Sequence, residues 1–186
     1  MIGDDDLKTK DLVLCALCAA LTCILAPLSI PTPGGVPISL ATFAVMLSGL
    51  VLGGKLGALS QLVYVLLGSA GLPVFAGWTG GAGLVLGMTG GYIIGYIFLA
   101  FFTGLIYFSM GRNAGGKEKY IWMAVSMVIG TAVLYAFGTA WFIKVTGMDL
   151  AASLSACVLP FLPGDALKIA GAAVLGGRLE KALRHV

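Results

Sequence analysis

The chain has 186 residues, of which 59% are hydrophobic and 10% charged, against roughly 25% charged residues in an ordinary soluble domain. Its mean hydropathy of +1.04 excludes a soluble globule and a disordered chain, and its net charge of +3 comes without the clustered basic face that nucleic-acid binding needs. Since a spanning helix takes about 20 apolar residues, the length fits roughly six such helices and leaves no room for a soluble catalytic or nucleotide-binding domain.

The apolar segments predict an all-α integral membrane protein with six transmembrane helices. They lie at about 11–28, 38–54, 56–72, 84–108, 120–143 and 163–184. The first follows acidic residues and lacks a small-residue cleavage site, so we do not expect a signal peptide. The linker at 149–159 is too short to span a bilayer and predicts a short helix lying against the outer surface of the bundle.

The basic residues predict the orientation of these helices. If the N-terminus is cytoplasmic, nine of the eleven Lys and Arg residues fall on the cytoplasmic side, and the external loops carry only Lys144. The nine are Lys8, Lys10, Lys55, Arg112, Lys117, Lys119, Arg178, Lys181 and Arg184. This bias follows the positive-inside rule, and with an even number of spans it places both termini in the cytoplasm.

The two longer external loops, at 29–37 and 71–83, carry no charge and are rich in glycine and proline. They could be simple turns. They are, however, longer than the tight turn at 53–57, and the second contains Phe75 and Trp78. Loops of this kind can fold back as a wall or lid over a cavity, and we expect Pro31 to Pro37 to close over a bound ligand.

Two motifs that suggest chemistry are incomplete. Residues 49–55 resemble a phosphate-binding loop, but Leu56 stands where that loop needs Ser or Thr, so nucleotide binding is not expected. Cys15 and Cys18 form a C-x-x-C inside an apolar segment, whereas a zinc site needs further ligands and the only histidine is His185. We expect neither a metal site, nor a disulfide framework, nor a cofactor.

The strongest internal signal is PFLPGDALK at 160–168. Asp165 and Lys168 are three residues apart and share one face of a helix. An ionisable group within a span costs up to about 2.5–3.5 kcal/mol, so we expect the two to face a cavity. The alternative is a mutual ion pair that only anchors the helix end. No catalytic residue is expected, because an aspartyl protease needs a second aspartate within a span and Asp149 lies in a linker.

A glycine-rich stretch at 77–96 offers a second set of candidate ligand contacts. They are Trp78, Thr79, Gly80, Gly91 and Tyr92. Glycine lets backbone approach a ligand closely, although glycines equally serve helix packing and aromatic residues an interfacial belt. In the first segment, Ala16 and Ala20 form a small-x-x-x-small motif that permits close helix approach.

The segments GLPVFAGWTGGAGLVLGMTGGY and FLPGDALK together resemble the biotin-specific substrate-binding component (BioY family, an S-component) of energy-coupling-factor (ECF) transporters. The resemblance covers nearly the whole chain and implies one transmembrane substrate-binding domain over 1–186 that captures biotin at a bacterial cell membrane. It implies a transmembrane coupling (T) component, which Ala16 and Ala20 would face, and two cytosolic ATPases that use the ATP. An S-component for another vitamin, or a stand-alone vitamin transporter, is the alternative.

The resemblance also assigns ligand contacts. It puts Asp165 and Lys168 in the biotin site and Thr79 at a polar position of the glycine-rich loop. Asp165 can accept from a ureido N–H, and Thr79 or a glycine N–H can donate to the ureido oxygen. Trp78 and Tyr92 can pack on the apolar ring system.

Two points stay open at this stage. Lys168 either contacts the carboxylate or another polar group of the ligand, or it orients Asp165, because one helical turn of about 5.4 Å is shorter than biotin. The chain also departs from the family pattern at Met88, where proline is frequent, and at Ile93, where some members have arginine. If that arginine binds the carboxylate, this protein must use something else.

Overall fold

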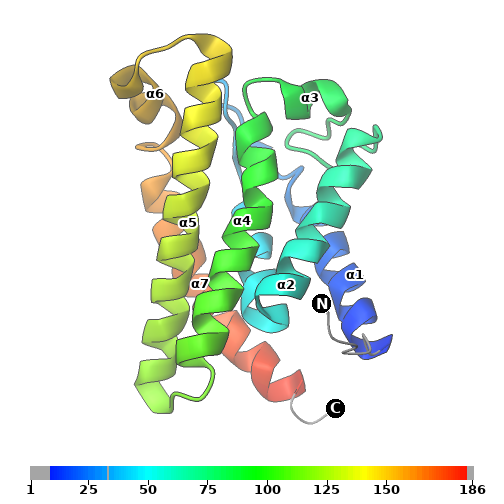
Figure 1. Ribbon diagram of the computed structural model, residues 1–186, viewed down its shortest axis with the longest axis vertical. Helices are drawn as coiled ribbons and strands as arrows, with labels where there is room; N and C mark the ends of the chain where they lie inside the picture. Colours follow the sequence, from blue (N-terminus) through cyan, green and yellow to red (C-terminus); the bar gives the residue numbers. More distant parts are fainter. Residues whose placement is uncertain (1–8, 33, 184–186) are drawn as a thin grey trace, which may run out of the picture.

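The computed structural model describes residues 9–32 and 34–183; Lys8, Arg184 and His185 lie outside this range. Its long helices lie side by side in a bundle (Figure 1). The elements are α1 (Thr9–Leu25), β1 (Ser29–Ile30), β2 (Ile38–Ser39), α2 (Ala41–Ser69), α3 (Ala82–Leu86), α4 (Gly90–Ile106), the π-helix η1 (Tyr107–Gly111), α5 (Gly116–Thr146), α6 (Leu150–Cys157) and α7 (Leu162–Leu183).

Helix α2 consists of two arms that fold back on each other at Gly53. The backbone there is not helical (φ 79°, ψ −178°), a conformation that glycine adopts without a Cβ penalty. Beyond the bend, Gln61 Nε2 donates a 3.0 Å hydrogen bond to Ser48 Oγ, whereas a straight helix would separate these residues by about 20 Å. The tight turn predicted at 53–57 is therefore present.

The fourth apolar segment is not the continuous helix that the sequence predicts at 84–108. The short helix α3 ends before Gly87, whose backbone is extended (ψ −169°), and α4 begins at Gly90. The Gly87 carbonyl accepts a 3.1 Å hydrogen bond from the Gly90 N–H and a second one, of 3.0 Å, from Trp141 Nε1 of α5. The helix is thus interrupted at Gly87, although the hydropathy of the segment is continuous.

At the other end of α5, the structure corrects the predicted place of Lys144. The helix continues to Thr146 and ends at Gly147, which has the left-handed conformation of a helix C-cap (φ 73°). Lys144 therefore lies in the last helical turn of α5 and not in a loop. The short helix predicted in the following linker is present as α6, and the Asp149 side chain caps it by accepting from the Ala152 N–H at 2.8 Å.

Small residues let the helices of the bundle approach closely. A Cβ at Gly49 would lie 2.7 Å from the Ala100 carbonyl of α4, and a Cβ at Gly104 would overlap the backbone of Gly53. Large apolar side chains, among them Met46 and Met127, fill the space between α2, α4 and α5. Much of the abundant glycine of the sequence thus serves packing between helices.

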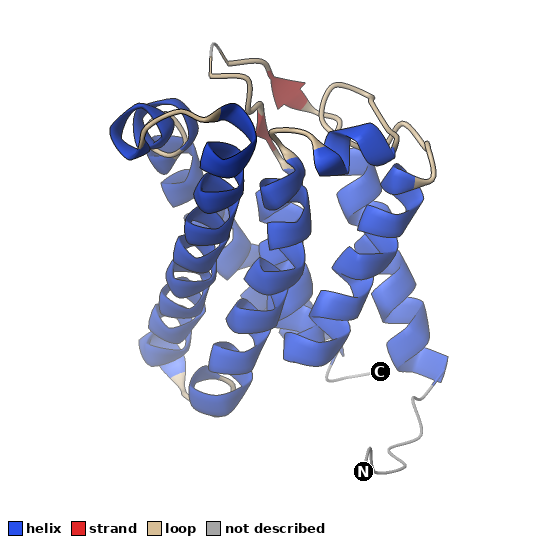
Figure 2. Cartoon of the chain, turned by 45° about the horizontal axis from the view of Figure 1, so that its top comes forward, coloured by secondary structure: helices blue, strands red, loops and turns tan. Residues whose placement is uncertain are grey.

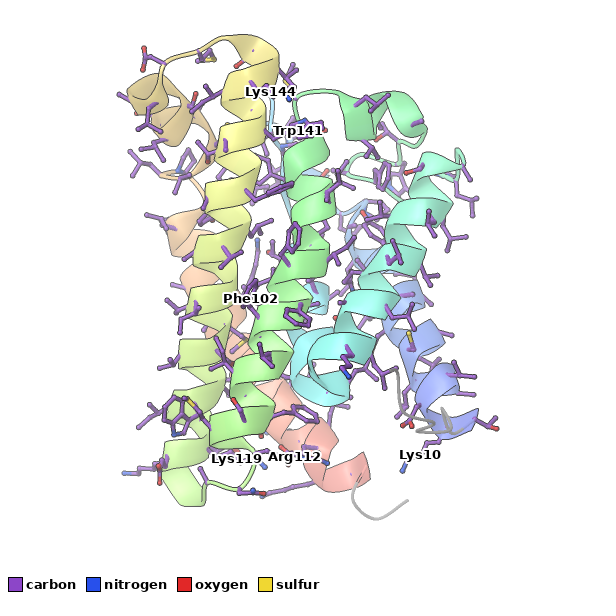
Figure 3. The ribbon with its side chains drawn as sticks, in the orientation of Figure 1. Lys10, Phe102, Arg112, Lys119, Trp141 and Lys144 are labelled. Carbon is purple, nitrogen blue, oxygen red and sulfur yellow. The ribbon has the colours of Figure 1, made fainter. Side chains whose placement is uncertain are left out.

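The two ends of the bundle differ in character. Figure 2 shows the two-stranded ribbon and the connecting loops over one end, where Lys144 also lies (Figure 3). The start of α1 and the end of α7 lie at the opposite end (Figure 1), together with Lys10, Arg112 and Lys119 (Figure 3). Three of these four basic residues therefore lie at the end opposite Lys144 (Figure 3).

Three described helical stretches are long and apolar enough to cross a membrane: Ala41–Ser69, Gly90–Gly111 and Gly116–Thr146. A fourth is added if α6 and α7, which meet at 49°, form one broken span. The first of these stretches is the bent helix α2, so its length is divided between two arms. The chain is thus a multi-pass membrane protein.

Candidate functional site

Two neighbouring cavities lie at the end of the bundle that carries the ribbon. The larger has a volume of about 230 Å³ and the smaller about 30 Å³. The side chains that line both are Val36, Pro37, Ser39, Tyr92 and Tyr96. Because these residues form a common wall, one ligand can occupy the larger cavity and reach into the smaller.

The smaller cavity holds Asp165 and Lys168, which the sequence predicts as a pair. Asp165 is only 4% exposed, and Lys168 Nζ lies 3.0 Å from its Oδ1. Tyr135 of α5 donates to Oδ2, and Lys168 donates to the Thr42 hydroxyl of α2 at 3.0 Å. The pair lines a cavity and is also a mutual ion pair, and its role in ligand binding stays a prediction.

This arrangement leaves the pair able to bind a neutral polar group. The Lys168 ammonium has three N–H donors, of which Asp165 and Thr42 use two. Asp165 Oδ1 accepts from Lys168 and, at 3.5 Å, from the Thr42 hydroxyl, whereas Oδ2 accepts from Tyr135 and keeps a second lone pair. One N–H donor and one carboxylate acceptor therefore stand side by side, held by three helices.

Aromatic side chains form the walls of the larger cavity. They are Tyr64, Phe75, Tyr92 and Tyr96. Phe75 packs edge-on against Tyr64, with ring centroids 5.6 Å apart. It comes from the loop after α2 and fits against Gly68, where any Cβ would overlap its ring. This contact anchors the loop over the cavity.

The loop at 29–37 also forms part of the wall. Ser29 pairs with Ser39 and Ile30 with Ile38 in an antiparallel ribbon, and the loop between the strands brings Gly35, Val36 and Pro37 to the larger cavity. Pro33 lies outside the described residues. The loop is more than a simple turn, and its closure over a ligand stays a prediction.

Thr79 and Trp78 lie in different places. Thr79 lines the larger cavity, but its hydroxyl donates to the Ala76 carbonyl at 2.9 Å, so in this conformation it offers a ligand only an acceptor. Trp78 is 64% exposed and has a left-handed backbone (φ 60°). It lines an outer groove that Lys168 also reaches, and it is not among the residues lining the larger cavity.

The two predicted glycine contacts serve packing in this structure. A Cβ at Gly80 would overlap the Leu72 carbonyl, and a Cβ at Gly91 would overlap the Trp141 side chain of α5. Neither glycine is among the residues that line the two cavities. By contrast, Tyr92 lines both, and its hydroxyl lies 3.0 Å from the Thr139 hydroxyl.

Sequence reasoning missed the residues that hold the ion pair in place. Tyr135 and Thr42 contact Asp165 and Lys168 from helices 30 and 126 residues away. Both are polar residues within apolar spans, which is a signal for interior contacts. The sequence alone does not pair them with the charges, because spacing along the chain gives no register between separate helices.

Ala16 and Ala20 are exposed on α1, beside Cys15 and Ala19, which are buried against the bundle. The small-x-x-x-small motif is therefore open to another helix. As for metals, the described residues contain no group of three or more His, Cys, Asp or Glu side chains that could hold an ion.

Comparison with known proteins gives matches along nearly the whole chain. The family model described as "BioY family" matches residues 3–185. A "Probable biotin transporter BioY" of Pyrococcus horikoshii is 42% identical over 174 residues, 94% of this chain and 98% of that protein. A "Biotin transporter BioY" of Thermotoga maritima is 39% identical over 172 residues, 92% and 96% of the two chains.

A solved structure matches as well. It is described as "Crystal structure at 2.1 A of the S-component for biotin from an ECF-type ABC transporter". The TM-score is 0.82 at 31% identity, and the match covers 95% of this chain and 94% of that one. The likeness therefore includes both the glycine-rich loop and the helix that carries Asp165.

Proposed function

The chain belongs to the BioY family, and from this premise we propose that it captures biotin as the S-component of an ECF-type transporter. Its role is binding and uptake, not catalysis. The observation that carries the proposal is the buried Asp165–Lys168 pair beside an aromatic cavity, in a chain that matches a solved S-component for biotin over 95% of its length.

We further propose one substrate-binding domain over 1–186 with six spans and both termini in the cytoplasm. The spans are α1, the two arms of α2, α4 with η1, α5 and α7. The hydrogen bond between Ser48 and Gln61 supports counting α2 twice. The basic residues gathered at the end opposite Lys144 (Figure 3) support the orientation, since they follow the positive-inside rule.

In the proposed complex the ring system of biotin fills the larger cavity and its ureido edge reaches the Asp165–Lys168 pair. A water needs roughly 10–15 Å³ of such a volume, so the 30 Å³ of the smaller cavity admits the edge of a ligand and not a bicycle. A ureido N–H donates to Asp165 and the ureido oxygen accepts from Lys168. Tyr92 and Tyr96 flank the rings.

The opposite pose, with the carboxylate of biotin on Lys168, fits less well. Asp165 lies 3.0 Å from Lys168 Nζ, so a second carboxylate at this position meets a like charge as well as the cation. A ureido group is neutral and satisfies both members of the pair. In this pose Thr79 lies beyond the rings, near the tail, while Trp78, Gly80 and Gly91 act by shaping the surrounding loops.

The T component and two ATPases are the proposed partners. The exposed Ala16–Ala20 face of α1 is the proposed contact with the T component, because small side chains allow helices to approach closely in a membrane. The ATPases supply the energy, so this chain needs no cofactor of its own.

The test is to purify the protein in detergent, identify the co-purified small molecule by mass spectrometry, and titrate the ligand-free protein with biotin. We expect biotin in the preparation and binding at low-nanomolar concentrations. Recovery of a different vitamin would favour an S-component of other specificity. Failure to bind biotin in a folded preparation would overturn the proposal.

A further inference from the structure

The end of the larger cavity away from the ion pair carries no charge. Described residues there are Gly35, Ala76, Thr79, Leu84, Thr89 and Ile93. The two hydroxyls among them donate to carbonyls, Thr79 to Ala76 at 2.9 Å and Thr89 to Leu84 at 3.3 Å. These six residues therefore offer a ligand no cation and no free hydroxyl proton.

If the ureido group lies on the Asp165–Lys168 pair, the carboxylate tail points to this uncharged end. A carboxylate that is buried without a cation is strongly destabilised, so the tail must end where water reaches it. Thr79 and Gly35 are exposed, and Leu84 and Thr89 are half-buried. This end is therefore the mouth of the larger cavity, where the cavity opens to water. Lys144 is exposed and is not among the lining residues.

We propose that this site recognises biotin by its ring system and not by the charge of its carboxylate, and that it therefore also binds biotins whose carboxyl group is amidated. The proposal rests on the proposed function and on the pose given there. An amide keeps the length of the tail and one acceptor oxygen, loses the charge, and replaces the second oxygen by an N–H donor. A substituent on the amide nitrogen leaves through the mouth between Gly35 and Thr79.

The first experiment compares biotin, biotinamide and biocytin (the amide of biotin with lysine) on the full-length protein in detergent. An exposed charge contact contributes up to about 1 kcal/mol, so we expect the three dissociation constants to agree within about fivefold. Amides that bind more than thirtyfold more weakly than biotin overturn the inference and leave the proposed function intact. If biotin itself does not bind, the proposed function fails as well.

The second experiment adds the missing cation. Leu84→Arg puts a guanidinium on a residue of α3 that lines the cavity. Leu86→Arg adds the same charge to the same short helix at a position that is 71% exposed and is not a lining residue. Because a charge-assisted hydrogen bond is worth about 1.5–3 kcal/mol, Leu84→Arg should favour biotin over biotinamide by about tenfold, and Leu86→Arg should not.

These variants also test the direction of the tail. If Leu84→Arg folds and binds biotinamide like the unmodified protein, but shows no new preference for biotin, the carboxylate does not lie at this end and the inference fails. If the unmodified protein already discriminates strongly and Leu84→Arg adds nothing, the carboxylate already has a cation elsewhere, which contradicts the inference equally.

Discussion

Tyr135 of α5 donates a hydrogen bond to Asp165 Oδ2 of α7, so the carboxylate is fixed from a neighbouring helix before any ligand arrives. Its other oxygen, Oδ1, is held by Lys168 at 3.0 Å. A site whose polar atoms are already oriented loses less conformational freedom on binding. The ureido edge of biotin would meet a carboxylate that does not need to move.

Tyr135→Phe removes this hydrogen bond while keeping the ring. Hydrogen bonds to charged groups are worth about 1.5–3 kcal/mol, and only part of that is lost from binding. We therefore expect the dissociation constant for biotin to rise about tenfold. Isothermal titration calorimetry measures it. The matched control is Tyr120→Phe in the same helix, where the side chain is 41% exposed; equal losses in both variants would contradict the positioning role of Tyr135.

Asp165→Asn should be more damaging. It leaves Lys168 buried without its partner, and breaking a buried pair costs about 3–5 kcal/mol, so we expect a lower melting temperature. It also removes the charged acceptor of the ureido N–H, so we expect biotin affinity to fall at least a hundredfold. Lys144→Ala should change affinity by less than threefold, because Lys144 does not line either cavity.

The double variant Asp165→Asn/Lys168→Met separates the two roles of the pair. It removes both charges, so the buried unpaired ammonium is gone and thermal stability should recover. Biotin binding should stay weak, because neither the ureido N–H nor its oxygen has a charged partner. A double variant that binds biotin as tightly as the unmodified protein would show that the pair is only a structural anchor.

The ion pair of Asp165 and Lys168 and its position at a cavity could be predicted from the sequence, because two charges three residues apart in an apolar span are conspicuous without any knowledge of the fold. Tyr135 and Thr42 are not conspicuous in the same way. Each becomes a site residue only because α5 and α2 bring it to α7, over 30 and 126 residues of chain. The position of a charge within a span can be deduced from the neighbouring residues, whereas the register between separate helices depends on the tertiary fold.

The same distinction explains which helix boundaries could be predicted. The bend at Gly53 could be predicted from the local sequence, because Gly53 and Gly54 are followed by Lys55. At the break at Gly87, by contrast, the carbonyl accepts a hydrogen bond from the indole of Trp141 across the bundle, a contact that the local sequence does not predict. Similarly, Gly80 and Gly91 look like ligand contacts in a glycine-rich loop, but the backbone of Leu72 and the side chain of Trp141 occupy the space beside them.

Gly68→Ala tests how the loop at 71–83 is anchored. The added Cβ would overlap the Phe75 ring, so Phe75 must leave its place beside Tyr64 and the cavity wall must shift. We expect at least tenfold weaker biotin binding. Gly83→Ala is the control, because its Cβ meets no atom within 4 Å. Unchanged affinity in a folded Gly68→Ala protein would mean that Phe75 does not support the site.

Deleting Gly34 and Gly35 tests whether the loop at 29–37 closes over the ligand. The loop contributes Val36 and Pro37 to both cavities, and a Cβ at Gly34 would lie 2.7 Å from the Ala156 carbonyl of α6. A shortened loop cannot keep both contacts, so we expect the release rate of biotin to rise about tenfold, which corresponds to about 1.4 kcal/mol. Stopped-flow displacement measures it, and unchanged affinity and release would refute closure.

Ala16→Leu/Ala20→Leu tests the proposed contact with the T component. Both residues are exposed on α1, so the larger side chains should fold normally and leave biotin affinity in detergent unchanged. They should block close helix approach, so co-purification with the T component and biotin uptake by cells should be lost. Ala132→Leu, at an exposed position of α5, is the matched control and should retain both. If the double variant still assembles and transports, the coupling surface lies on another helix, and the ligand site is unaffected by that result.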